Sequence, residues 1–151
     1  MLPVTAVIPE AEAGRETRTV FRFVRGCAVR AESLASSFRF AFRGLVYLLR
    51  TQRNARIHFA AGLGVAASAA WLGCSNVEWA ILILAMGVVL AAEFANTTAE
   101  TIVDLAAPEY HELARIAKDV AAGGVLLTSV MSVGVGLLIL GPPLWAALFG
   151  L

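Results

Sequence analysis

The sequence predicts an all-α membrane protein with three transmembrane helices and an N-terminal amphipathic helix at the membrane surface. Of the 151 residues, 59% are hydrophobic, three long apolar stretches follow residue 57, and the cationic residues are unevenly distributed. A soluble domain of this length does not need so many apolar residues for its core, so the excess is expected to face lipid. A net charge of +1 offers no basic surface for a nucleic-acid partner.

Residues 1–30 combine prolines, acidic residues and scattered arginines without a sustained period. This composition predicts a weakly ordered cytoplasmic tail. The first 20 residues have no apolar core of signal-peptide length, so we expect no cleaved targeting sequence. The two cysteines, Cys27 and Cys74, are expected on opposite sides of the bilayer and therefore as free thiols.

Residues 31–52 show the periodicity of an amphipathic helix lying in the membrane surface. The alternative is the outer helix of a soluble bundle, which the apolar chain that follows disfavours. One face of this helix is apolar and the other is charged. The apolar face holds Leu34, Phe38, Ala41, Phe42, Leu45, Leu48 and Leu49, and the charged face holds Glu32, Arg39, Arg43 and Arg50.

Three apolar stretches predict membrane spans over residues 57–73, 78–105 and 116–149. In the first, small residues recur every four positions, which lets another helix approach closely. In the third, two adjacent prolines after a glycine are expected to end or kink the regular helix. These residues are Ala60, Gly64 and Ser68 in the first stretch, and Gly141, Pro142 and Pro143 in the third.

The distribution of cations predicts the topology. Every lysine and arginine lies before Ile57 or at Arg115 and Lys118. The positive-inside rule therefore places the N-terminus and the second loop in the cytoplasm and the C-terminus outside. The tryptophans agree, because each of the three falls at the outer end of a predicted span, as an aromatic belt requires. They are Trp71, Trp79 and Trp145.

The second span carries a polar stripe of Glu93, Asn96, Glu100 and Asp104. At about 100° per residue, these side chains fall within about 80° of arc on an otherwise apolar helix. Glu93 lies about 21 Å from the outer end of the span, at the inner boundary of the hydrocarbon layer. A charge turned toward lipid there costs on the order of 3 kcal/mol or more, so the stripe is expected to face the bundle interior. Glu93 is accordingly a candidate general base.

The loop after the stripe returns through Arg115, Lys118 and Asp119, which supply cations and a further carboxylate suited to phosphate binding. The acidic residues of this region could instead be ordinary solvated charges, an alternative that is strongest for Asp104, Glu109 and Glu112. His58 and His111 have no cysteine or carboxylate at the spacing of a zinc site. Interfacial or hydrogen-bonding roles are expected for both histidines.

Three segments together resemble the signature of the prokaryotic diacylglycerol kinase family. They are Glu93-Phe94-Ala95-Asn96-Thr97-Thr98-Ala99-Glu100-Thr101-Ile102-Val103-Asp104, then Glu109-Tyr110-His111-Glu112-Leu113, and finally Ala117-Lys118-Asp119-Val120-Ala121-Ala122. The resemblance covers about residues 36–140, including the run Arg53-Asn54-Ala55-Arg56-Ile57-His58. It identifies residues 31–151 as a membrane lipid kinase domain.

The resemblance implies a homotrimer in the bacterial inner membrane that transfers the γ-phosphate of ATP to a lipid hydroxyl with Mg²⁺ as cofactor. Glu93 would be the general base, with Asn96 and Asp119 as polar members of the catalytic site. Lys118 would hold the nucleotide phosphates, with Asp119 also on the nucleotide side, and Glu100 would ligate Mg²⁺. Asp104 and His111 match the motif without a defined role.

One residue departs from the family pattern. Where the family commonly has a second metal-binding glutamate, at the end of the surface helix, this chain has Gln52. Its amide oxygen can ligate Mg²⁺ but adds no charge, so metal affinity is expected to fall. Gln52 is therefore expected as a weakened metal ligand, and activity depends on whether another group compensates.

The acceptor lipid implied by the resemblance is undecaprenol or diacylglycerol, and the run Arg53-Asn54-x-Arg56-Ile57-His58 favours the undecaprenol kinase branch. A second hypothesis is a proton-coupled transporter or channel with Glu93 and Glu100 as a relay. It is disfavoured because no acid or base continues a pathway through the outer half of the second or third span. A third hypothesis is a kinase-like scaffold disabled by Gln52.

Overall fold

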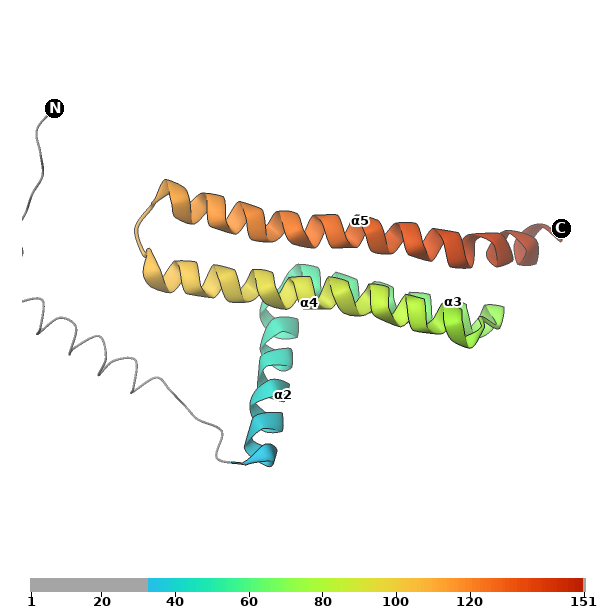
Figure 1. Ribbon diagram of the computed structural model, residues 1–151, viewed down its shortest axis with the longest axis horizontal. Helices are drawn as coiled ribbons and strands as arrows, with labels where there is room; N and C mark the ends of the chain where they lie inside the picture. The colour runs from blue at the N-terminus through green and yellow to red at the C-terminus, as the bar shows by residue number, and fades with distance from the viewer. Residues whose placement is uncertain (1–32, 151) are drawn as a thin grey trace, which may run out of the picture. The chain divides into compact units, whose positions relative to one another are not determined.

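The computed structural model describes residues 33–150, which form four α-helices and no strand (Figure 1). The all-helical fold predicted from the sequence is thus confirmed for this part of the chain. The tail predicted over residues 1–30 lies outside it, as does Cys27, whereas Cys74 is a free thiol. The helices are α2 (Leu34–Thr51), α3 (Arg53–Leu72), α4 (Asn76–Ala106) and α5 (Glu112–Phe149).

The first half of α2 belongs to one unit of the chain, residues 1–42, and its second half to another, residues 43–151. At the start of α2, each of two serines accepts a hydrogen bond from the backbone amide of the other. Ser33 N donates to Ser36 Oγ at 3.0 Å, and Ser36 N donates to Ser33 Oγ at 3.2 Å. The apolar face of this half is exposed, with Leu34 at 81% and Phe38 at 75%.

A single residue separates α2 from α3. Gln52 is extended, with φ −99° and ψ 116°, so the helical hydrogen bonding is interrupted there. The turn before it is anchored by Leu48, which is only 1% exposed. Helix α3 begins at Arg53, four residues before the predicted span, because a helix continues beyond the hydrocarbon layer wherever its backbone bonds can form.

A short turn joins α3 to α4. Gly73 adopts a left-handed conformation at φ 70°, which glycine reaches without steric penalty, and its amide donates to the carbonyl of Ala69. Helix α4 then opens with a capping box. Ser75 Oγ accepts from the Glu78 amide, while the Glu78 carboxylate accepts from the Ser75 amide at 2.7 Å.

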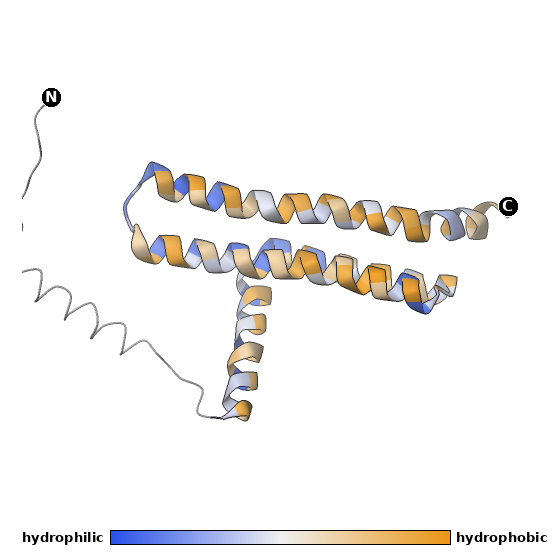
Figure 2. Cartoon of the chain, in the orientation of Figure 1, coloured by the Kyte–Doolittle hydropathy of each residue, from blue (hydrophilic) through white to orange (hydrophobic). Residues whose placement is uncertain are grey.

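Helices α4 and α5 run side by side in opposite directions, and α3 contacts both (Figure 1). The loop between α4 and α5 ends at His111. Its Nδ1 accepts a hydrogen bond from the Leu113 amide at 3.2 Å and caps α5. This cap starts α5 at Glu112, ahead of the predicted span from residue 116. Polar residues concentrate at this loop end, whereas the rest of α4 and α5 is mainly apolar (Figure 2).

Helix α5 does not end at Gly141, Pro142 and Pro143 but continues to Phe149. The other expected outcome, a kink at these residues, stays a prediction. The fixed φ of proline near −65° matches a helix, so the prolines remove two amide donors without forcing the chain out of helical geometry. In the last turn of α5, the ring centroids of Trp145 and Phe149 lie 4.4 Å apart, and this contact stabilises the end of the helix.

Helices α4 and α5 are long and apolar enough to cross a membrane. With 31 and 38 residues, they extend about 46 Å and 57 Å at 1.5 Å per residue, against a hydrocarbon layer of about 30 Å. The third expected span, α3, carries Arg53, Arg56 and His58 near its start, and its crossing of the membrane remains a prediction.

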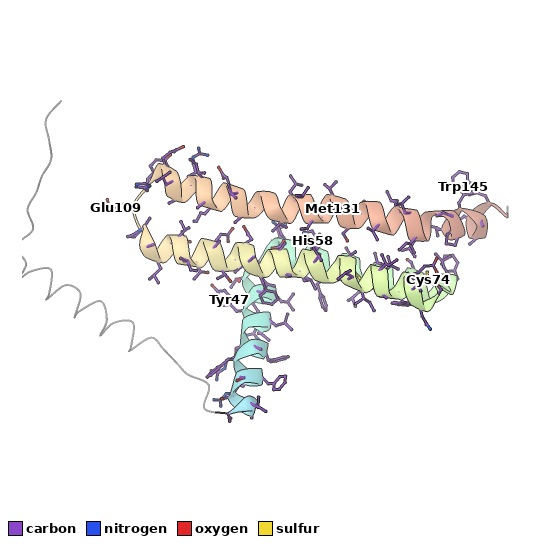
Figure 3. The ribbon with its side chains drawn as sticks, in the orientation of Figure 1. Tyr47, His58, Cys74, Glu109, Met131 and Trp145 are labelled. Carbon is purple, nitrogen blue, oxygen red and sulfur yellow. The ribbon has the colours of Figure 1, made fainter. Side chains whose placement is uncertain are left out.

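The two ends of the α4–α5 pair differ chemically. Cys74 and Trp145 lie at one end, and Glu109 lies at the other (Figure 3). Trp71 closes α3 and Trp79 opens α4, so the chain connectivity brings them to the same end as Trp145. Trp71 and Trp145 are 65% and 59% exposed, as side chains at a membrane interface would be.

We predict that Ser75→Ala lowers the free energy of unfolding by about 1 kcal/mol, because it removes the side-chain acceptor at the start of α4. The measurement is reversible unfolding in mixed detergent micelles, followed by helical circular dichroism. Asn76→Ala, at the next position, which is also exposed, leaves both capping bonds in place and should shift stability by less than about 0.5 kcal/mol. Equal effects of the two substitutions would contradict a stabilising role of the capping box.

Candidate functional site

Three polar side chains are buried in the described part of the chain, and all three lie on one stretch of α4. Glu93 is 1% exposed, Asn96 8% and Thr97 7%. The positions follow the spacing of a single helical face, which here is turned inward rather than toward lipid. Polar groups buried in this way normally serve a binding or catalytic purpose, because an unpaired buried charge is costly.

The Glu93 carboxylate lies where α3, α4 and α5 approach one another. His58 of α3 places its Nε2 atom 3.3 Å from Glu93 Oε1. The same Nε2 lies 3.5 Å from Ser129 Oγ of α5, and that hydroxyl donates to the Val125 carbonyl at 2.7 Å. The buried carboxylate is therefore connected to both neighbouring helices.

The Glu100 carboxylate is held by two amides. Gln52 Nε2 donates to Glu100 Oε2 at 3.3 Å, and Asn96 Nδ2 donates to Glu100 Oε1 at 3.1 Å. Gln52 is the residue between α2 and α3, so it is distant in sequence but adjacent in space. The structure thus brings together Asn96, Glu100 and Gln52, three of the residues that the sequence assigns to the site.

Several buried oxygen atoms have no well-aligned hydrogen-bond partner among the described residues. They are Glu93 Oε1, Asn96 Oδ1 and Thr97 Oγ1. A buried polar atom left unpaired costs about 1–3 kcal/mol. Asn96 Oδ1 and Thr97 Oγ1 are therefore candidate contacts for a ligand, whereas Glu93 Oε1 has His58 Nε2 at 3.3 Å. Oxygen atoms of this kind suit a hydroxyl group or a hard cation.

The charged residues nearer the loop form two pairs. Lys118 Nζ contacts Asp104 Oδ1 at 2.5 Å, joining α5 to the exposed end of the polar stripe. Asp119 accepts from Arg115 at 2.7 Å, and its side chain is 64% exposed. Lys118 therefore lies one helical turn beyond Glu100, while Asp119 contacts Arg115 rather than the buried residues.

Arg115 also pairs with Glu112 at 2.6 Å, and Tyr110 donates to the same carboxylate at 2.6 Å. These groups are exposed, so the pairs contribute little to stability. Their arrangement nevertheless gathers two cations and three carboxylates around the start of α5. A polyanion such as a nucleotide phosphate could exchange for a carboxylate at either cation.

The residues around Glu100 fit Mg²⁺ when it is carried by a nucleotide. Among the described residues, no three acidic, histidine or cysteine side chains gather as a metal cage. Mg²⁺ commonly binds through one or two carboxylates together with phosphate oxygens and water. Glu100 supplies one carboxylate, and rotation of the Gln52 amide would add a neutral oxygen ligand.

The sequence interpretation missed Thr97 and Ser129 and gave His58 only a general hydrogen-bonding role. Thr97 follows Glu93 by four residues, so the helical spacing already placed it near the same face. Nothing in the spacing of Ser129 connects it to Glu93, because that contact runs through a third helix. The connection is visible only in the structure, where His58 of α3 contacts both Ser129 and Glu93.

Comparison with known proteins identifies a family. A family model described as prokaryotic diacylglycerol kinase matches residues 39–140. A diacylglycerol kinase from Synechocystis is 45% identical over 115 residues, covering 76% of this chain and 66% of that protein. An undecaprenol kinase from Bacillus subtilis is 41% identical over 108 residues, covering 72% and 88%. A diacylglycerol kinase from Escherichia coli is 34% identical over 65 residues, covering 43% and 53%.

The matched region contains α3, α4 and most of α5, and therefore every buried polar residue described above. It stops before Pro142, and it excludes the first 38 residues. The chain spans just under two thirds of its cyanobacterial relative and most of the Bacillus protein. The resemblance noted in the sequence is thereby confirmed, and the chain belongs to the prokaryotic diacylglycerol kinase family, whose named relatives are lipid kinases.

Proposed function

We propose that this chain is an ATP- and Mg²⁺-dependent lipid kinase that transfers the γ-phosphate to the hydroxyl of a lipid alcohol. One observation carries the proposal: a buried carboxylate, Glu93, lies on the same helical face as unpaired oxygens of Asn96 and Thr97, one to two turns from the amide-held Glu100. A base beside a metal-binding carboxylate is what phosphoryl transfer to a hydroxyl requires.

In this proposal, Glu93 accepts the proton of the lipid hydroxyl as its oxygen forms a bond to the γ-phosphorus and the bond to the ADP oxygen breaks. Asn96 and Thr97 orient the hydroxyl next to the base. Lys118 leaves Asp104 to contact the phosphates, and Asp119 with Arg115 borders the nucleotide. Mg²⁺ bound at Glu100 and Gln52 would supply neutralisation of the phosphate charge.

We place the site at the cytoplasmic face of the bacterial inner membrane. The cations on the loop side and the exposed tryptophans at the opposite end support this orientation. Helix α3 would complete three spans, and the exposed apolar face of α2 would rest in the headgroup layer. A homotrimeric assembly follows from the family resemblance alone.

The acceptor that we favour is undecaprenol, with diacylglycerol as the other candidate. The support is the run Arg53-Asn54-x-Arg56-Ile57-His58, which resembles the undecaprenol kinase branch. The Bacillus undecaprenol kinase also aligns over 88% of its length. Because the chain is 45% identical to a diacylglycerol kinase, any assay has to test diacylglycerol as well.

We predict that Glu93→Gln lowers phosphate transfer by about 10²–10⁴-fold, because the amide cannot accept the hydroxyl proton. The assay uses purified protein in mixed micelles with ATP, Mg²⁺ and undecaprenol or diacylglycerol in separate reactions. The matched control is Glu109→Gln, which removes an exposed loop carboxylate and should leave the rate within about twofold.

Loss of activity in both variants, or in neither, would contradict the role of Glu93. A wild-type protein that phosphorylates neither lipid while reconstituted vesicles move protons would replace the kinase proposal with the transporter hypothesis. In that case, Glu93→Gln should abolish proton movement, since a relay needs an ionisable group at that depth.

We predict that Gln52→Glu lowers the Mg²⁺ concentration for half-maximal activity roughly tenfold or more. A further charge about 4 Å from a cation contributes about 4 kcal/mol at an effective dielectric of 20, and each 1.4 kcal/mol is tenfold. Binding of Mn²⁺ to the nucleotide-loaded protein, followed by electron paramagnetic resonance, reports the same affinity without turnover.

Without metal, the new glutamate would face Glu100 in place of the present amide donor, so the metal-free variant should unfold at a lower temperature. The control is Thr51→Glu, which adds the same charge one residue earlier on an exposed side chain. Equal changes in the two variants would remove Gln52 from the metal site. A rise from undetectable to measurable turnover in Gln52→Glu would instead favour the disabled-scaffold hypothesis.

A further inference from the structure

The surroundings of Glu93 contain a second ionisable side chain that the proposed reaction does not use. His58 projects from α3, and its side chain is 25% exposed, whereas that of Glu93 is 2% exposed. The other charged group near Glu93 is Glu100 of the same helix, and α5 contributes the neutral hydroxyl of Ser129. His58 is therefore the one described partner that can donate a hydrogen bond to the base from another helix.

The contacts of Ser129 bear on which ring nitrogen of His58 carries a proton. The Ser129 hydroxyl donates to the Val125 carbonyl at 2.7 Å, so its hydrogen is already used. Its oxygen therefore offers only a lone pair to His58 Nε2, 3.5 Å away. Glu93 Oε1, on the other side at 3.3 Å, also offers lone pairs when ionised. With Glu93 ionised, two acceptors around one ring nitrogen favour the tautomer that carries its proton on Nε2.

We propose that His58 is a positioning residue that donates from Nε2 to Glu93 Oε1 and fixes the carboxylate with its second oxygen directed to the lipid hydroxyl. The inference rests on the proposed kinase function, in which Glu93 is the base. The bond is poorly aligned in the present geometry, which leaves Oε1 without a full partner. Contacts of this kind commonly tighten when substrate binds.

Ser129 supports this arrangement from the third helix. Its hydrogen is held by its own helix, so its oxygen can only accept from Nε2, as a second and longer contact at 3.5 Å beside the 3.3 Å contact to Glu93 Oε1. The polar contact thus runs from α5 through α3 to α4. A base whose partner is itself held keeps the short approach that proton transfer needs, and a displacement of about 1 Å can cost about 10²-fold in rate.

We expect His58→Leu to lower kcat about 10²-fold while the KM for ATP changes less than about threefold, because the nucleotide side of the site is untouched. His58→Gln should recover kcat to within about fivefold of wild type, since its Nε2 amide donor reaches a similar position. Ser68→Ala, which removes a hydroxyl of α3 bonded to its own helix at Gly64, is the control and should have wild-type kinetics.

A spectroscopic measurement tests the contact independently of turnover. The ¹⁵N NMR signals of histidine distinguish the protonated from the unprotonated ring nitrogen, and a His111→Asn variant assigns the two histidines. We expect His58 Nε2 to be protonated at neutral pH in the wild type. Its resonance should shift in Glu93→Leu, which removes the acceptor.

The outcomes separate the two proposals. If the wild-type protein is active and His58→Gln is as slow as His58→Leu, or if Nε2 is unprotonated, the positioning role is overturned and the kinase function stands. If the wild-type protein phosphorylates neither lipid, the kinase function fails, and the positioning role fails with it even where NMR still detects the contact. Recovery in His58→Gln together with a protonated Nε2 supports both.

Discussion

The need to bury a carboxylate among apolar helices constrains the rest of this structure. Glu93 is 1% exposed, and an isolated charge at that depth would cost several kcal/mol. The helices around it therefore have to supply polar partners at the same level. His58 does so from α3, and Ser129 of α5 contacts His58 in turn. Close approach of α3 is in turn allowed by Ala55 and Ala69, both fully buried small residues.

The polar stripe on α4 changes character along its length. Glu93 and Asn96 are buried, Glu100 is partly covered by Gln52, and the Asp104 side chain is 66% exposed. Each step of one turn moves the side chain from an apolar environment toward water. This gradient matches the chemistry that we propose, since proton abstraction benefits from a dry base while phosphate binding uses mobile, solvated cations.

The sequence predicted the helices and the stripe because both follow from local periodicity. It placed the starts of α3 and α5 four residues late, since hydropathy detects the part suited to lipid whereas the backbone bonds extend to Arg53 and Glu112. It left open whether Pro142 and Pro143 end or kink the helix, and α5 continues through them because the fixed φ of proline is compatible with a helix. The pairing of Lys118 with Asp104, and the route from Ser129 to Glu93, depend on packing between helices that spacing does not encode.

The length of α4 and α5 has a consequence for where two dissimilar substrates would meet. Both helices exceed the hydrocarbon thickness by about 15 Å or more, so in the proposed orientation their loop ends would project into the aqueous phase. A water-soluble nucleotide would then bind without entering the membrane, and a long-chain alcohol would expose its head without leaving it. The boundary between water and lipid would itself align the reacting groups. A small protein would then not need to enclose either the nucleotide or the lipid alcohol.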